Sequence, residues 1–171
     1  MGKLVKFDIR DMPDILLVGK DIRHSMAEQM KGNNPLPGFW DKCFTEDVFK
    51  ALEAQANYVF DDAYVGVMAD WATGDGCFSY IVGMLMKPGA QVPSGYICRE
   101  LKAEKVGIGW IQGKDVSDVC SNAHELTEQR LKSDGHSCAN MAWCMELYNC
   151  PRFTTPDENG EIILDYYIPL D

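Results

Sequence analysis

The sequence lacks several features that would assign it to a broad class at once. No apolar run approaches the ~18 residues of a transmembrane helix, and no linker or low-complexity stretch divides the chain. A chain of 171 residues can bury enough surface to fold without a metal or a disulfide. We therefore expect one domain over residues 1–171 and no membrane partner.

Basic residues are few. The chain has 16 Lys and Arg against 26 Asp and Glu, which gives a net charge of −10, and no basic cluster offsets it. Binding to nucleic acid depends largely on neutralisation of phosphates by Lys and Arg. The composition therefore argues against direct nucleic-acid binding. It favours cationic partners, or it serves solubility alone.

The seven cysteines form an odd set without CxxC spacing. Cys138, Cys144 and Cys150 recur every six residues, which is not the spacing of a known metal site. The segment HELTEQ has Glu128 where a zinc-protease motif requires histidine. We expect free, mostly buried thiols in a reducing cytoplasm, with no metal and no cofactor. The histidines lie in separate segments, at positions 24, 124 and 136.

The chain contains a weak internal repeat, about 1–87 and 96–171, with 88–96 as the crossing. Each half reads strand, helix, strand, strand. The pattern predicts an α+β fold of two pseudo-symmetric βαββ halves, with antiparallel sheets and helices on one side, and a cleft could lie at the joint of the halves. The expected strands are 15–24, 64–71, 77–86, 105–113, 142–149 and 161–170, and the first expected helix is 40–57 after a loop at 33–39.

The second expected helix covers 115–135. Asp115 or Ser117 could cap its start, and either Leu126 or Thr127 could continue its buried face. We expect His124 on its solvent-exposed surface. The end is marked by Gly135.

The segment AWCMELYNCP, residues 142–151, sets a glutamate within a buried-strand pattern. Alternate residues of a strand share a face. We expect one face to pack against a helix and the other to line a partly apolar hollow. The packing face is Trp143, Met145 and Leu147, and the hollow is lined by Cys144, Glu146 and Tyr148.

The matching strand of the first half, 64–71, places Met68 on a face comparable with that of Glu146. Glycines recur along the strands at positions 66, 83, 107 and 109. They could leave room for a ligand, or they could simply mark bends in the sheets.

The order of motifs resembles the gyrase-inhibitor-like effector-binding domain from about Asp14 to Leu170. The motifs are PLPGFW, YVGVMADW, CFSYIVGMLM, VPSGY, KVGIGWIQG and MELYNCPRF followed by IILDYYIP. This domain is the ligand-binding part of many bacterial AraC-type and MerR-type multidrug regulators, and it also occurs as a free-standing protein. The regulators add a helix-turn-helix domain that has no counterpart here, so we expect no transcription factor activity from this chain alone.

The resemblance implies two βαββ-like halves around a groove that binds aromatic, often cationic, small molecules. The acidic residue of the family motif falls on Glu146, followed by Tyr148. Trp40 matches the family's tryptophan ahead of the first helix. Further aromatic positions implied to line the groove are Trp71, Tyr80, Trp110 and Tyr167.

A buried glutamate among aromatics suits a hydrophobic cation, whose charge compensates the carboxylate. Without ligand, we expect burial to raise the pKa of Glu146 above ~4.3, or a tyrosine hydroxyl to donate to it. In an alternative hypothesis, the protein hydrolyses reactive electrophiles, with Glu146 as general acid or base and Tyr148 orienting substrate. A third is a protein-interaction role of gyrase-inhibitor type, with a homodimer or a regulator as partner. Strand edges at 1–12 or 77–86 could pair in such a dimer.

Overall fold

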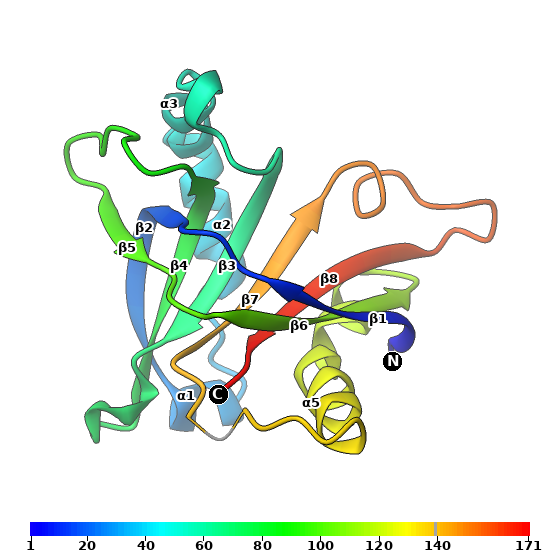
Figure 1. Ribbon diagram of the computed structural model, residues 1–171. Helices are drawn as coiled ribbons and strands as arrows, with labels where there is room; N and C mark the ends of the chain where they lie inside the picture. The colour runs from blue at the N-terminus through cyan, green and yellow to red at the C-terminus, as the bar shows by residue number, and fades with distance from the viewer. Residues whose placement is uncertain (139) are drawn as a thin grey trace. The chain divides into compact units, whose positions relative to one another are not determined.

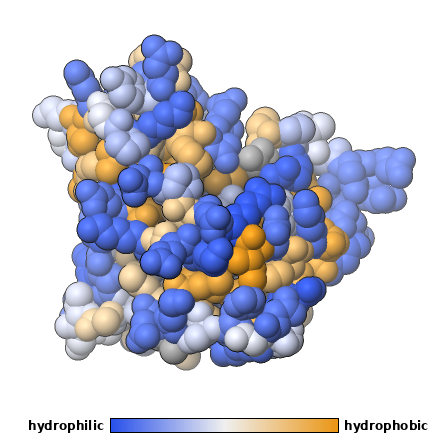
Figure 2. Space-filling model, viewed as in Figure 1, coloured by the Kyte–Doolittle hydropathy of each residue, from blue (hydrophilic) through white to orange (hydrophobic). Residues whose placement is uncertain are grey.

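The computed structural model describes residues 1–138 and 140–171 and shows the predicted α+β fold (Figure 1). The chain forms two compact units. Unit 1 combines Met1–Pro13 with Lys102–Asp171, and unit 2 is Asp14–Leu101. In Figure 2, polar residues cover most of the visible surface, as expected for a net charge of −10.

Unit 1 contains an antiparallel sheet with the strand order β1-β6-β8-β7. Helices α4 and α5 pack against β6 and β8. The elements are β1 Lys3–Asp11, β6 Lys105–Gly113, α4 Val116–Ser121, α5 Ala123–Ser133, β7 Trp143–Asn149 and β8 Ile162–Pro169.

Unit 2 contains an antiparallel sheet with the strand order β3-β4-β2-β5. Helices α2 and α3 cover this sheet, and their apolar residues join one core with side chains of β2 and β4. The elements are β2 Leu16–Ser25, α1 Met26–Met30, α2 Leu36–Thr45, α3 Val48–Glu53, η1 Ala56–Tyr58, β3 Ala63–Ala69, η2 Trp71–Thr73, β4 Cys77–Met86 and β5 Ile97–Glu100.

The six predicted strands match β2, β3, β4, β6, β7 and β8 within one or two residues. The repeat boundaries differ from the expectation, because β1 pairs with β6 and therefore belongs to unit 1. The short β5 pairs with β2 in unit 2. The expectation that 77–86 is a sheet edge is wrong, because β4 pairs with both β2 and β3.

Each predicted helix is interrupted. Asp47 adopts a left-handed conformation, with φ of 54°, between α2 and α3. Helix α2 begins at Leu36, inside the predicted loop, because Pro37 occupies the first turn, where its missing N–H costs no hydrogen bond. In unit 1, Asn122 with φ of −137° separates α4 from α5. Asp115 is the cap of α4, and its side chain accepts from the backbone N–H of Asp118.

Glycines allow close approaches in both units. A Cβ on Gly107 would lie 2.7 Å from Leu131 of α5, and one on Gly109 would collide with Thr127 of α5. Thr127 is fully buried, which decides between the two alternatives for this helix face. The room along β6 is thus occupied by α5 and is not a hollow. In unit 2, Gly83 lies opposite Gly19 of β2, and a Cβ there would collide with the Val18 carbonyl.

Candidate functional site

Strand pairing determines which face of unit 1 carries Glu146. Glu146 pairs with Tyr166 of β8, and Tyr166 pairs with Gly109 of β6. Directly paired residues lie on the same side of a sheet. Because Gly109 faces Thr127 of α5, Glu146 lies on the side covered by the helices of unit 1.

The opposite face of β7 is the one predicted to meet a helix. Trp143, Met145 and Leu147 are buried as predicted, with exposures of 4%, 0% and 1%. Their expected packing against a helix is wrong within unit 1, where α4 and α5 cover the other face. A strand buried on both faces offers little polarity contrast, so its pattern alone does not show which side the helices take.

The half-buried carboxylate of Glu146 accepts a hydrogen bond from a neighbour on its own strand. The Tyr148 hydroxyl donates to Oε2 of Glu146 at 2.9 Å. This agrees with the expectation of a tyrosine hydroxyl donating to the glutamate. The ring of Tyr148 makes an edge contact with Phe153, with centroids 4.8 Å apart.

A thiol from α4 completes this group. Sγ of Cys120 lies 3.9 Å from Oη of Tyr148, and the thiol also interacts with the Glu146 carboxylate. Burial, and next the charge of Glu146, raise the pKa of Cys120 far above its ordinary 9.0. The thiol therefore stays protonated and is a poor nucleophile.

A second hydrogen-bonded chain lies beside the first. The hydroxyl of Tyr166 donates to Sγ of Cys144 at 3.1 Å, and Nδ1 of His124 lies 3.2 Å from the same hydroxyl. Burial raises the pKa of Cys144 to about 12. Burial lowers the pKa of His124 below 6.5. The expectation of a surface histidine is wrong, because His124 is half-buried against Tyr166.

Four of the expected ligand residues gather in unit 2. Met68 pairs with Tyr80 across β3 and β4, and Nε1 of Trp40 donates to the Tyr80 hydroxyl at 3.0 Å. Met68, Trp40 and Trp71 are partly buried against the core that contains Tyr80. Tyr80 itself is only 2% exposed, so it supports this group from beneath.

An aromatic stack extends this group. The ring of Tyr64 stacks on the ring of Phe49, with centroids 3.8 Å apart. The Tyr64 hydroxyl donates a hydrogen bond to the Glu53 carboxylate at 2.6 Å. The ring centroid of Phe44 lies 4.9 Å from that of Phe49, and Phe44 is 53% exposed. The ring of Trp40 stacks on that of Phe49, with centroids 6.0 Å apart.

Two expected residues do not accompany Glu146. Trp110 pairs with Asp165 and Tyr167 pairs with Met145, which places both on the face of unit 1 opposite Glu146. Trp110 is 5% exposed, with the Lys6 ammonium 4.5 Å from its ring centre.

Several neighbours of the expected residues were not found from the sequence. In unit 1 these are Cys120, His124, Phe153 and Tyr166, and in unit 2 they are Phe44, Phe49 and Tyr64. A sequence signal existed for Phe153, which stands in the MELYNCPRF motif, and for Phe49, which is an apolar residue within the predicted helix 40–57. The others depend on strand register and helix placement.

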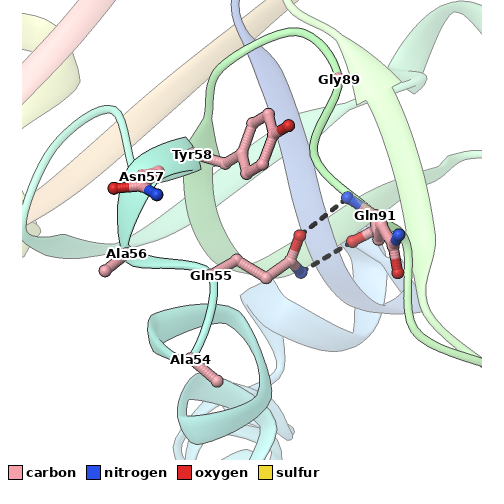
Figure 3. Close-up of a pocket in the computed structure, with 7 residues that line it drawn as sticks. All are labelled: Ala54, Gln55, Ala56, Asn57, Tyr58, Gly89 and Gln91. Carbon is pink, nitrogen blue, oxygen red and sulfur yellow. Dashed lines mark hydrogen bonds between the residues drawn. The ribbon is translucent and has the colours of Figure 1, made fainter.

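A shallow hollow of about 370 Å³ lies at the 54–58 turn of unit 2. Figure 3 shows the Gln55 amide bound to the Gln91 backbone by two hydrogen bonds, each 2.8 Å long, with the Tyr58 ring near Gly89. The lining residues carry no charge, so this hollow offers no counter-ion for a cation. They are Ala54, Gln55, Ala56, Asn57, Tyr58, Gly89 and Gln91.

Over residues 1–138 and 140–171, no three His, Cys, Asp or Glu residues are grouped so as to hold a metal ion. None of the helices described there combines the length and the hydropathy that crossing a membrane requires.

Comparison with known proteins gives structural matches alone. No protein-family model matches the sequence, and no curated protein sequence matches it. The structure of SAV2435 bound to tetraphenylphosphonium is similar, with a TM-score of 0.68 and 15% identity over 98% of this chain and 94% of that one.

Two further solved structures are similar. One, from Staphylococcus aureus MU50, is described as a bacterial transcription regulation protein, with a TM-score of 0.65 and 18% identity over 97% of this chain and 98% of that one. The other is an integron cassette protein from Vibrio cholerae, with a TM-score of 0.61 and 13% identity over 99% of each chain. At these identities the similarity shows the fold, which is consistent with a gyrase-inhibitor-like effector-binding fold.

Proposed function

We propose that this protein binds hydrophobic, aromatic cations and that Glu146 provides the counter-charge. The observation that carries the proposal is the half-buried Glu146 carboxylate, which accepts from Tyr148 on the helix-covered face of unit 1. A hydrogen bond from a phenol satisfies an oxygen lone pair without cancelling the negative charge. A carboxylate in partly apolar surroundings gains from a cation that needs little hydration.

Aromatic rings near the carboxylate support the same ligand class. Tyr148 and Phe153 present π systems that attract a cation, each by about 0.5–2 kcal/mol depending on solvent exposure. In unit 2, Trp40, Met68 and Trp71 are partly exposed and remain proposed ligand contacts. A large flat or propeller-shaped cation would use such surfaces in preference to a compact, strongly hydrated one.

The structural neighbours add support at the level of ligand class. SAV2435 was solved with tetraphenylphosphonium, a hydrophobic cation with four phenyl groups. Together with the motif order of the sequence, this leads us to propose that the chain is a free-standing member of the gyrase-inhibitor-like effector-binding family.

The test is a calorimetric titration with tetraphenylphosphonium, with neutral triphenylphosphine oxide as the uncharged comparator. We expect Glu146→Gln to weaken phosphonium binding at least about tenfold, equivalent to about 1.4 kcal/mol, and to leave the comparator unchanged. Glu158→Gln, at an exposed loop position, is the charge-matched control. Equal phosphonium affinity in wild type and Glu146→Gln would overturn the assignment of Glu146.

A further inference from the structure

We infer that Cys120 is a positioning residue for Glu146, and that its thiol acts as a hydrogen-bond donor to the Glu146–Tyr148 pair. The inference rests on the proposed function, because it concerns how the proposed counter-charge is maintained. It gives a half-buried cysteine a specific role in ligand binding that does not involve covalent chemistry.

The direction of the hydrogen bonds follows from the inventory of protons. Tyr148 has one hydroxyl proton, and it is donated to Oε2 of Glu146 at 2.9 Å. At the 3.9 Å contact between Cys120 and Tyr148, the thiol must therefore be the donor and the phenol oxygen the acceptor. The same thiol interacts with the Glu146 carboxylate. The thiol has one proton, which it donates either to the Tyr148 oxygen or to the Glu146 carboxylate, and in both cases the positive end of the S–H dipole points towards the Glu146–Tyr148 pair.

The thiol retains its proton over the whole range in which Glu146 can titrate. Burial raises the pKa of Cys120 well above 9.0, and the neighbouring carboxylate raises it further. A thiol that donates to a carboxylate favours the charged form over the protonated acid. Loss of the donor should therefore make the site lose its charge at a higher pH.

The other titratable groups around Glu146 can be separated from this effect. Burial raises the pKa values of Cys144 and Tyr166, so both stay neutral below pH 9. His124 titrates in the acid range, but it contacts Tyr166. The described groups that interact with Glu146 include Cys120 from α4, Cys144 and Tyr148 from β7, and Tyr166 from β8, with His124 of α5 one hydrogen bond further away.

The experiment measures tetraphenylphosphonium affinity from pH 4 to pH 8 for wild type, Cys120→Val, Cys120→Ala and Cys120→Ser. We expect the pH of half-maximal affinity to rise by about 0.5 unit or more in the valine and alanine variants, which lack a donor. The affinity at pH 8 should stay within about twofold of wild type, because pH 8 lies well above the ordinary pKa of a glutamate, about 4.3. Serine keeps a donor and should keep the wild-type midpoint.

A merely structural role gives a different pattern. It lowers the melting temperature, or the affinity at every pH, without moving the midpoint. An unmoved midpoint in both Cys120→Val and Cys120→Ala, or an equal shift in Cys120→Ser, would overturn the inference. A different result would overturn the proposed function, namely that Glu146→Gln binds tetraphenylphosphonium as tightly as wild type does. His124→Asn, measured alongside, reports any contribution from the histidine.

Discussion

The indole nitrogen of Trp40 donates to the hydroxyl of Tyr80 at 3.0 Å, which connects α2 to β4 in unit 2. Tyr80 is 2% exposed, so its hydroxyl is an acceptor held in the core. We expect Tyr80→Phe to lower the free energy of unfolding by about 1 kcal/mol, measured by urea denaturation. Tyr58→Phe is the control, because Tyr58 is 41% exposed. If Trp40→Phe abolishes the effect of Tyr80→Phe in a double-mutant cycle, the hydrogen bond is its source.

Strands β2 and β4 approach closely at Gly19 and Gly83. We therefore expect an alanine substitution at Gly83 to lower stability, in contrast to one at a glycine with open space around it. Gly83→Ala places a methyl group against the Val18 backbone, where no side chain can move aside, and should destabilise by about 3 kcal/mol. Gly38→Ala, in α2, meets nothing within 4 Å and should stabilise by about 0.5–1 kcal/mol. Thermal unfolding of both variants is the measurement, and equal effects would contradict this reading of the sheet.

The burial of His124 predicts a loss of stability on acidification. Its pKa in the folded protein lies below the ordinary value of 6.5, mainly because burial disfavours the charged ring. Between the two pKa values the unfolded chain binds the proton and the folded chain does not, so stability falls as pH drops below about 6.5. We expect His124→Asn to reduce the fall in melting temperature between pH 7 and pH 5. His136→Asn, at an exposed position, should retain the wild-type slope.

The thiols should differ sharply in reactivity. Cys98 and Cys150 are exposed, whereas burial raises the pKa of Cys43 to about 11 and that of Cys144 to about 12. At pH 8, we expect iodoacetamide to label Cys98 and Cys150 first in the native protein, as read by peptide mass spectrometry. Cys43, Cys120 and Cys144 should react at a comparable rate only in urea. Rapid native labelling of Cys120 would contradict its description as a half-buried thiol that stays protonated at pH 8.

Strands were easier to predict from this sequence than the environment of the site. Segments such as 77–86 and 105–113 are apolar, β-branched and bounded by turn residues, which is enough to define their ends. The helix breaks at Asp47 and Asn122 were missed because neither residue is a strong helix breaker. The dipeptide Asn159-Gly160 is typical of a two-residue hairpin turn, but it lies in a longer loop between β7 and β8, with φ of 74° at Gly160.

The face of the sheet that each residue occupies was harder to predict, because strand register determines which residues share a face. The parity of 142–149 correctly separates Trp143, Met145 and Leu147 from Glu146, but it does not show on which side α4 and α5 lie. Trp110 and Tyr167 are aromatic and lie on strands, yet their pairing partners place them away from Glu146. These facts come from hydrogen bonding between segments far apart in the sequence, which a single chain pattern does not encode.

The position of β1 in unit 1 has a consequence for the order of events during synthesis. Asp11 pairs with Lys105, so the first strand leaves the ribosome on the order of ten seconds before its partner β6 is made. Unit 2, which runs without interruption from Asp14 to Leu101, is complete before that partner emerges. The middle of the chain can therefore fold first, and the nascent protein carries an unpaired N-terminal strand until translation passes β6.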